Sequence, residues 1–332
     1  MKKFLAILTL LCYSSAHTQD IASQPVFVPG ELNPIKDSIV NHRQYFGKQI
    51  KPNRGRIYLA AAGSAAIYAG SLVALSNAWY KDYPQSSFHF FNDNDDWLQV
   101  DKAGHVFSAY NTAKWSMEMW RWAGLSKKQR IWVGGLSGTA FLTVVEVLDG
   151  FSSGWGFSIG DLGADLAGSS LFIAQELGWN EQRIQVKFSF HRNDYTDLSL
   201  NNRANELFGT HTPERMLKDY NGQTYWVSAN LKSFYKKANL PAWLNIAIGY
   251  GAEGMFGGTE NRVKDKNGFT LFDRTDVPRY RQWYLAPDID LTKIKTKSKF
   301  LKSTFFLLNS LKFPTPSIGF SKKGIEWNWL HF

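Results

Sequence analysis

The hydrophobic pattern of this chain changes near Arg183. Before that residue, long segments carry apolar side chains at helical spacing. Beyond it, apolar and polar residues alternate in short segments, separated by turn signals such as Asn221-Gly222 and Asn267-Gly268. A spacing of three or four residues predicts helices, and alternation predicts strands. The sequence therefore predicts an α+β protein, in which an N-terminal four-helix bundle precedes an antiparallel β-sheet or partial barrel.

The predicted helices have short connections, which is typical of a bundle. They cover residues 57–78, 101–122, 126–149 and 158–178. Ser126 with Gln129, and Ser158 with Asp161, have the spacing of capping boxes. Residues 57–78 hold no charge, and a helix of this length spans ~33 Å, close to the ~30 Å of a hydrocarbon core. A membrane-embedded helix and a buried central helix of a soluble bundle both fit this stretch, and membrane insertion is the favoured alternative.

Six segments beyond Arg183 read as strands: IQVKFSF, TYWVSANL, WLNIAIGY, RQWYLAPDIDL, TFFLL and IEWNWLHF. An outer-membrane barrel needs at least eight strands. In the last segment, Glu326 and Asn328 also share a face with Leu330, which argues against a lipid-facing strand. A further predicted strand, KIKTKSKF, places Lys293, Lys295, Lys297 and Lys299 on one face. These lysines would protect a sheet edge from aggregation or contact anionic lipid.

The N-terminus has the layout of a secretory signal peptide over residues 1–19. Lys2 and Lys3 precede an apolar run, and small polar residues follow up to Ala16. Cys12 is the alternative anchor of a lipoprotein, although Leu11 is not the small residue expected before it. Cys12 is the single cysteine, so the exported chain contains no disulfide.

Three further regions follow the signal peptide. Residues 20–55 form an irregular arm that is broken by prolines and holds one short helix near 36–46. A helical domain over 56–180 and a β-rich region over 181–332 complete the chain.

The formal net charge of +10 and the pI of about 9.4 favour anionic partners. Export makes nucleic acid a poor candidate, so the expected partner is membrane lipid or a lipopolysaccharide surface; protein partners are unknown. The aromatic content of 15% suits a membrane–water boundary, and it equally suits a soluble protein with a large aromatic core.

Three predicted helices each carry a spaced pair of ionisable residues among small and apolar neighbours. The pairs are Asp101/His105, Glu146/Asp149 and Asp161/Asp165, with Lys102 beside the first. Residues three or four apart share a helix face, so each helix can aim both members at one point. Such groups are costly to desolvate without partners. These seven residues are therefore the candidate site, and His105 is expected to be buried at a close helix crossing beside Gly104.

Helix geometry offers simpler interpretations for part of this set. Asp101 is placed to be an N-cap, Asp161 lies at the third position of a capping box, and Asp149 can end a helix before Gly150. Glu146 and Asp165 are harder to explain in this way. An Asp-rich stretch at Asp93, Asp95 and Asp96 lacks the glycine and distal glutamate of a standard calcium loop, so a solvated turn is expected there.

Three chemical interpretations remain open if the pairs converge. Carboxylates with one imidazole suit Mg, Mn or Fe better than Zn, although the Glu-x-x-His motif of di-iron bundles is absent. His105 with Glu146 or Asp165 could act as the catalytic acid and base. A hydrogen-bonded network that fixes helix register needs no ligand. Cofactor and metal are therefore unknown at this stage.

The segments DKAGHVFSAY and EVLDGFSSGWGFSIGDLGADLAG resemble the YfiM-like predicted periplasmic proteins, domain-of-unknown-function family 2279. They are more distantly similar to VanZ-like membrane proteins. The resemblance covers roughly residues 57–178 and rests on Asp101, Lys102, His105, Glu146, Asp161, Asp165 and Gly168. It implies an exported envelope protein, periplasmic or associated with the outer membrane, whose activity is not established. We therefore expect a membrane-associated structural or ligand-binding protein. The alternative is an enzyme that uses the His/carboxylate site on a lipid or cell-wall precursor.

Overall fold

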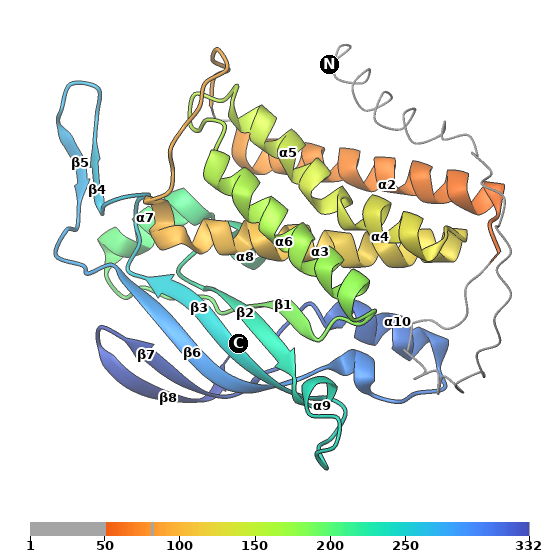
Figure 1. Cartoon of the computed structure of the whole chain (residues 1–332). Helices are drawn as coiled ribbons and strands as arrows, with labels where there is room; N and C mark the ends of the chain where they lie inside the picture. Colours follow the sequence, from red (N-terminus) through yellow and green to blue (C-terminus); the bar gives the residue numbers. More distant parts are fainter. Residues whose placement is uncertain (1–50, 81–82, 332) are drawn as a thin grey trace, which may run out of the picture. The chain divides into compact units, whose positions relative to one another are not determined.

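The computed structural model describes residues 51–80 and 83–331 (Figure 1). The predicted signal peptide, Cys12 and the short helix near 36–46 lie outside these residues. The described chain is an α+β structure, with long helices first and an antiparallel sheet after them. The coarse fold prediction is therefore confirmed.

The helical part contains α2 (Arg54–Leu75), α3 (Val100–Ala123), α4 (Lys127–Gly135), α5 (Ser137–Asp149) and α6 (Ile159–Gly178). Two short segments, η1 (Ser76–Tyr80) and η2 (Asp96–Gln99), lie between α2 and α3. The Ser126–Gln129 capping box is present at the start of α4, but the predicted third helix is interrupted at Leu136. The apolar core lies between α3, α4 and α6, around Tyr110, Ile131 and Phe172.

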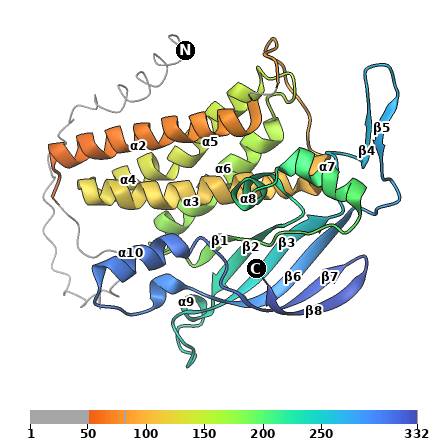
Figure 2. The ribbon, with the colours of Figure 1, turned by 180° about the vertical axis from the view of Figure 1, so that it is seen from behind.

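A four-helix bundle is not confirmed, because α2 shares little of the core. Of its residues, Ala60 is the only buried one, and Tyr58 and Ile67 are 73% and 64% exposed. Figures 1 and 2 show α2 on the outside of the other helices. Its sequence is apolar or small on every side beyond the first turn, so no single face is selected for burial. By length and composition, Arg54–Leu75 and Lys127–Asp149 could each cross a membrane.

The main sheet has six antiparallel strands in the order β1-β2-β3-β6-β7-β8, and these described strands do not close into a barrel. They are β1 (Ile184–Phe190), β2 (Gln223–Asn230), β3 (Leu244–Glu253), β6 (Tyr280–Ile289), β7 (Thr315–Ser321) and β8 (Gly324–His331). A separate hairpin joins β4 (Arg262–Lys264) to β5 (Thr270–Asp273). Its turn contains Gly268 at φ +85°, as the Asn-Gly pair predicts.

Shorter helices connect the strands. They are α7 (Leu198–Phe208), α8 (Thr212–Lys218), α9 (Leu231–Phe234), η3 (Leu291–Lys293) and α10 (Lys299–Leu308).

The predictions of strands at KIKTKSKF and TFFLL are wrong. The first segment forms η3, a stretch without regular structure and the first residues of α10, and the second lies inside α10. Ser298 caps this helix by accepting a hydrogen bond from Leu301 N at 3.3 Å. A short apolar run fits a helix and a strand equally well, and here the cap decides. The four lysines therefore share no strand face, and Lys293 instead pairs with Glu181.

One side of the six-stranded sheet buries charged and polar groups. Lys187 Nζ lies 2.7 Å from Asp288 Oδ2, and both side chains are fully buried. Ser228 Oγ donates to the same Asp288 oxygen at 2.6 Å. We call this the polar sheet side. The opposite side carries Val186 and Phe188 of β1, which are buried, and α3 packs there.

Candidate functional site

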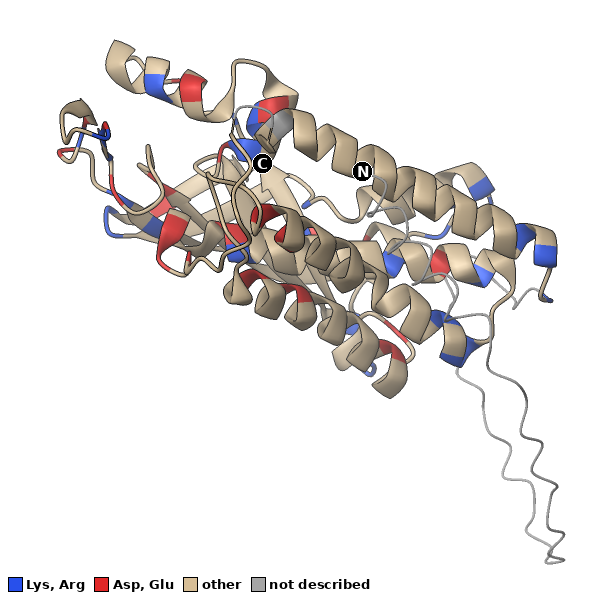
Figure 3. Cartoon of the chain, turned by 90° about the horizontal axis from the view of Figure 1, so that it is seen from above, with Lys and Arg blue, Asp and Glu red and all other residues tan. Residues whose placement is uncertain are grey.

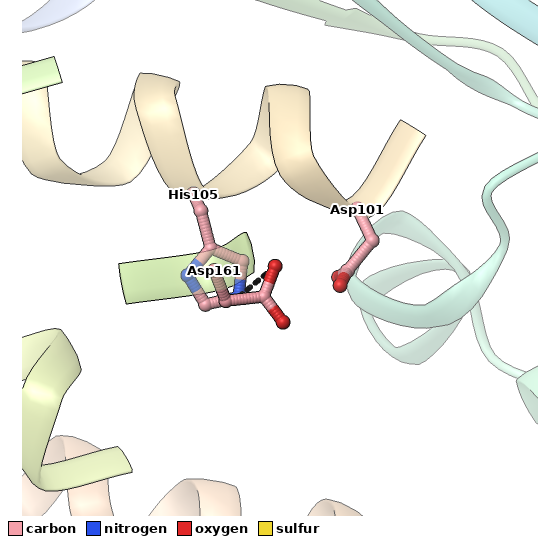
Figure 4. Close-up of side chains that lie close together, drawn as sticks. All are labelled: Asp101, His105 and Asp161. Carbon is pink, nitrogen blue, oxygen red and sulfur yellow. Dashed lines mark ion pairs between the residues drawn. The ribbon is translucent and has the colours of Figure 1, made fainter. Parts of the chain in front are cut away.

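The predicted site residues come together from three helices. Asp101, Lys102 and His105 lie on α3, Glu146 and Asp149 at the end of α5, and Asp161 and Asp165 at the start of α6. Glycines allow these helices to approach closely. A Cβ on Gly138 of α5 would stand 2.3 Å from Ala109 O, and one on Gly168 of α6 would stand 2.4 Å from Val106 O. The close-up shows Asp101 and His105 on one helix, with Asp161 reaching the imidazole from another (Figure 4).

His105 is oriented by Asp165. Its Nδ1 lies 3.0 Å from Asp165 Oδ1, and because a carboxylate only accepts, Nδ1 carries the hydrogen. The other nitrogen, Nε2, lies 3.8 Å from both Glu146 Oε1 and Asp161 Oδ1. These distances are too long for hydrogen bonds. Nε2 therefore faces both carboxylates without a hydrogen bond to either of them.

Lys102 bridges two carboxylates beside the imidazole. Its Nζ lies 2.6 Å from Asp93 Oδ1 and 2.7 Å from Asp161 Oδ1, and 3.8 Å from Asp101 Oδ2. Ser158 Oγ donates to Asp93 Oδ1 at 2.6 Å. Asp93, which was expected in a solvated turn, is therefore part of the site.

The predicted capping box at Ser158 is half present. Ser158 Oγ accepts from Asp161 N at 3.1 Å, as a cap requires. Ser158 N, however, donates to Glu146 Oε2 at 3.1 Å instead of to Asp161. The Asp161 carboxylate is therefore free to face Lys102 and His105. Asp161, for which the sequence also allowed a role in helix capping, is thus part of the cluster.

Two local predictions on α3 are wrong. The helix begins at Val100 with Gln99 at the cap position, so Asp101 is not an N-cap and instead accepts a hydrogen bond from Tyr220 Oη at 2.7 Å. Gly104 does not face a helix crossing, because a Cβ there would stand 2.9 Å from Tyr225 Oη on β2. Both differences arise from contacts with the sheet half of the chain.

Asp149 does end α5 before Gly150, as expected, and its Oδ1 also accepts a hydrogen bond from Tyr80 Oη at 2.6 Å. Sequence reasoning missed Tyr80 and Tyr220 because neither lies near the spaced pairs. The capping pattern at Ser158 could have indicated that residue. For Asp93, the only indication in the sequence was the high density of aspartates around it.

The cluster is largely enclosed. The exposed fraction of the side chain is 0% for Asp165, 2% for Glu146, 5% for Asp161 and 16% for His105. Asp165 Oδ2 is buried and has no hydrogen-bond partner among the residues that the structure describes. An orphaned buried carboxylate oxygen is costly and is suited to a ligand that the protein alone does not supply.

The surroundings change the protonation of the imidazole and of Asp161. Burial alone would lower the pKa of His105, but the hydrogen bond that its Nδ1 donates to Asp165 and the charges of Asp101 and Asp161 raise it to about 10. Burial and the neighbouring Asp101 raise the pKa of Asp161 to about 7. At neutral pH the imidazole therefore holds a proton unless another cation takes its place.

The donor set can hold a metal ion. Asp101, His105 and Asp161 each offer one ligand atom, and these atoms lie within 4.8 Å of one another. The cluster as a whole combines two basic groups, Lys102 and His105, with six carboxyl groups, which are Asp93, Asp101, Glu146, Asp149, Asp161 and Asp165. Fully ionised, the site carries an excess of negative charge.

Residues 89–175 match the model of a family described as "Predicted periplasmic lipoprotein (DUF2279)". This segment contains all seven predicted site residues and Asp93. No curated protein and no solved structure matches the chain. The match supports the resemblance to family 2279 and indicates an exported envelope protein of unknown activity, while the likeness to VanZ-like proteins stays a prediction.

Proposed function

We propose that this is a membrane-associated protein of the cell envelope whose His105 centre binds a divalent cation. One observation carries the proposal: the ligand atoms of Asp101, His105 and Asp161 lie within 4.8 Å of one another. Glu146 Oε1 lies a further 3.8 Å from His105 Nε2, too far for a hydrogen bond. Two ligands held at about 2.1 Å from one ion lie roughly 3 to 4 Å apart. A cation between the ligand atoms of Asp101, His105 and Asp161 would contact all three after side-chain movements that bring these atoms closer together.

The groups around the imidazole favour a cation site over a hydrogen-bonded network that holds no ligand. Asp165 holds Nδ1 of the imidazole at 3.0 Å, which is the usual way that proteins orient a metal-binding histidine. Lys102 neutralises only part of the acidic charge, through Asp93 and Asp161. One nitrogen among oxygen donors favours Mn²⁺, Mg²⁺ or Fe²⁺.

Calorimetric titration of the purified chain with Mn²⁺ tests this function. We expect saturable binding that Asp161→Asn and Glu146→Gln abolish, and that Asp165→Asn weakens about 10- to 100-fold. Glu176→Gln is the matched control, because Glu176 is a buried carboxylate elsewhere on α6 whose partner is Gln182. Absence of saturable binding, or equal binding by all variants, would contradict the proposal.

A second candidate function is acid catalysis on a lipid or cell-wall precursor. It is favoured by the His105–Asp165 pair, in which a carboxylate fixes the imidazole and leaves Nε2 facing the partly enclosed site. A protonated His105 would act as the acid. His105→Ala and Asp165→Ala should then spare folding. A matched loss of thermal stability in both variants would instead favour a structural network.

Membrane association is proposed from the surface of α2. Figure 3 shows this helix without acidic or basic residues beyond its first turn, and its large apolar residues Tyr58, Leu59, Ile67 and Val73 are all more than 60% exposed. Burying such side chains in lipid is favourable by about 1.5–3 kcal/mol each. Fractionation of the envelope, with carbonate and then detergent extraction, tests this. Release by carbonate would argue against insertion.

A further inference from the structure

Two rows of apolar side chains cross the six-stranded sheet from strand to strand. The pairing register places Val186, Val227, Ile248, Leu285, Ile318 and Trp327 in one row. The neighbouring row consists of Phe188, Tyr225, Tyr250, Trp283, Phe320 and Ile325. Because side chains alternate along a strand, both rows lie on the side opposite the polar sheet side. Neither row contains a charged residue.

Helix α3 covers only the beginning of these rows. The Phe107 ring lies 5.6 Å from Phe188 and 5.8 Å from Tyr225, and Asn111 Nδ2 donates to Val186 O at 3.0 Å. Tyr250 of β3 is still covered, because it packs against the buried cluster around Val100 and donates a hydrogen bond to Leu98 O. Further along the rows, β6, β7 and β8 extend past the helices in Figures 1 and 2. The exposed part, which we call the apolar sheet face, consists of Val227, Ile248, Trp283, Leu285, Phe320, Ile325 and Trp327, all at least 39% exposed.

This arrangement inverts the usual order of a sheet in water. An antiparallel sheet with one solvated face normally turns its polar side outward. Here the charged Lys187–Asp288 pair is fully buried beside a small aromatic cluster around Trp226 and Tyr284, and the side chains of the apolar sheet face point outward. Exposed apolar patches of this kind mark surfaces that something else covers.

Strand β8 follows the same arrangement, although Glu326 and Asn328 argued in the sequence against a lipid-facing strand. Ile325 pairs with Phe320 and Trp327 pairs with Ile318, whereas Glu326 pairs with Gly319. The apolar sheet face of β8 is therefore formed by Ile325 and Trp327, and Glu326 belongs to the polar sheet side.

We propose that the apolar sheet face is covered by lipid of an anionic membrane. Basic residues lie at both strand ends: Arg281 and Lys322 at one end, Lys236 and Lys237 after β2 at the other, all exposed. Such residues interact with anionic headgroups, and tryptophans such as Trp283 and Trp327 favour the membrane–water boundary. A second copy is disfavoured as the cover, because each chain carries a formal net charge of +10.

The open edge of the sheet sets the depth of this contact. The described strands do not close, and unpaired edge groups find no partners in the hydrocarbon core. The apolar sheet face therefore lies at the boundary between headgroups and acyl chains, with no strand crossing the bilayer. This inference rests on the proposed membrane association, to which it adds a second surface, and it is independent of the cation site.

Spin labels on single introduced cysteines test the inference. The variants are Ile248→Cys and Leu285→Cys on the apolar sheet face, Ile67→Cys on α2, and Lys266→Cys, an exposed residue between β4 and β5, as the water-facing control. The full chain is reconstituted in vesicles of phosphatidylethanolamine and phosphatidylglycerol, and the unsubstituted protein measures any label on Cys12. Collision of each label with oxygen and with a water-soluble nickel complex is then compared.

The expected result is that labels at 248 and 285 lose access to the nickel complex and gain access to oxygen, relative to the label at 266. Nickel access at 248 and 285 equal to that at 266 would overturn the proposal. Shielding from both reagents, with spin–spin broadening between chains, would also overturn it, because a second copy would then be the cover. The label at position 67 distinguishes the proposal for α2 from the proposal for the sheet. If only this label is exposed to lipid, membrane association through α2 is supported and the proposal for the apolar sheet face is refuted.

Discussion

Gly168 on α6 lies directly against Val106 on α3, so that a Cβ at position 168 would stand 2.4 Å from the Val106 carbonyl oxygen. This contact fixes the distance between the two helices that carry Asp165 and His105. One turn away from it, the carboxylate and the imidazole meet at 3.0 Å. The separation of the helix backbones and the geometry of the site therefore depend on each other.

Gly168→Ala should destabilise the protein by about 1–3 kcal/mol, because the added methyl group overlaps with the α3 backbone. Gly163→Ala on the same helix is the matched control, since a Cβ there meets nothing within 4 Å. Replacing a helical glycine without a clash should be stabilising by roughly 0.5–1 kcal/mol. Urea denaturation of both variants measures the difference. Similar effects at the two positions would show that α3 and α6 are not in this close contact.

Asp165→Asn should lower the pKa of His105 from about 10 toward its ordinary value near 6.5. The substitution keeps the size of the side chain but removes the negative charge that favours the imidazolium. NMR titration of the imidazole measures this value. Glu176→Gln, elsewhere on α6, should leave it unchanged, and an unshifted pKa in Asp165→Asn would refute the pairing.

The contribution of His105 to stability should decrease with rising pH. Its pKa is higher in the folded chain than the ordinary 6.5, so the folded state binds the proton more tightly than the unfolded state. The stabilisation is then complete below pH 6.5 and is lost as the pH rises through about 10. Denaturation of the wild type and of His105→Gln should differ most near pH 6. A difference that stays constant up to pH 10 would contradict this.

Lys187→Met should cost about 3–5 kcal/mol, because it removes the ion-pair partner at 2.7 Å and leaves the buried Asp288 only Lys312, whose Nζ is 3.8 Å away. Adding Asp288→Asn should recover only part of this loss, since it removes the buried carboxylate charge but takes the nearby carboxylate from Lys312. The more exposed pair Arg262–Asp273 gives the comparison, and Arg262→Met should change stability by at most about 1 kcal/mol. Thermal or chemical denaturation of the four proteins distinguishes these outcomes. A mild effect of Lys187→Met would mean that water reaches Asp288.

Helical spacing was sufficient to predict that the seven site residues converge, because each pair lies on one helix face and capping signals located two helix starts. What the pattern could not show were the partners from outside the helices. Tyr220 reaches Asp101 across 119 residues of sequence and Tyr80 reaches Asp149 across 69. No local signal encodes such contacts. Asp93 was misinterpreted because an Asp-rich loop is usually solvated, and Lys102 is long enough to draw it into the cluster.

In the sheet half, β1, β2, β3, β6 and β8 followed from alternation and from their turn residues. The strand β7 was missed because Pro316 and Gly319 weaken its pattern. The helix α10 was taken for a strand because its apolar run is short. Alternation located the strands but could not tell which face meets water. The inverted burial around Asp288 became visible only with the pairing register.

The polar sheet side has a practical consequence for work with this molecule. Its buried charges Lys187, Asp288 and Lys312 lie next to one another, so their contacts do not depend on what touches Ile248 or Leu285 from the other side of the strands. Replacing those two side chains by serine or threonine would leave the internal ion pairs in place. Such a redesigned chain would need less detergent in solution, and α2 would then be its main surface for contact with lipid.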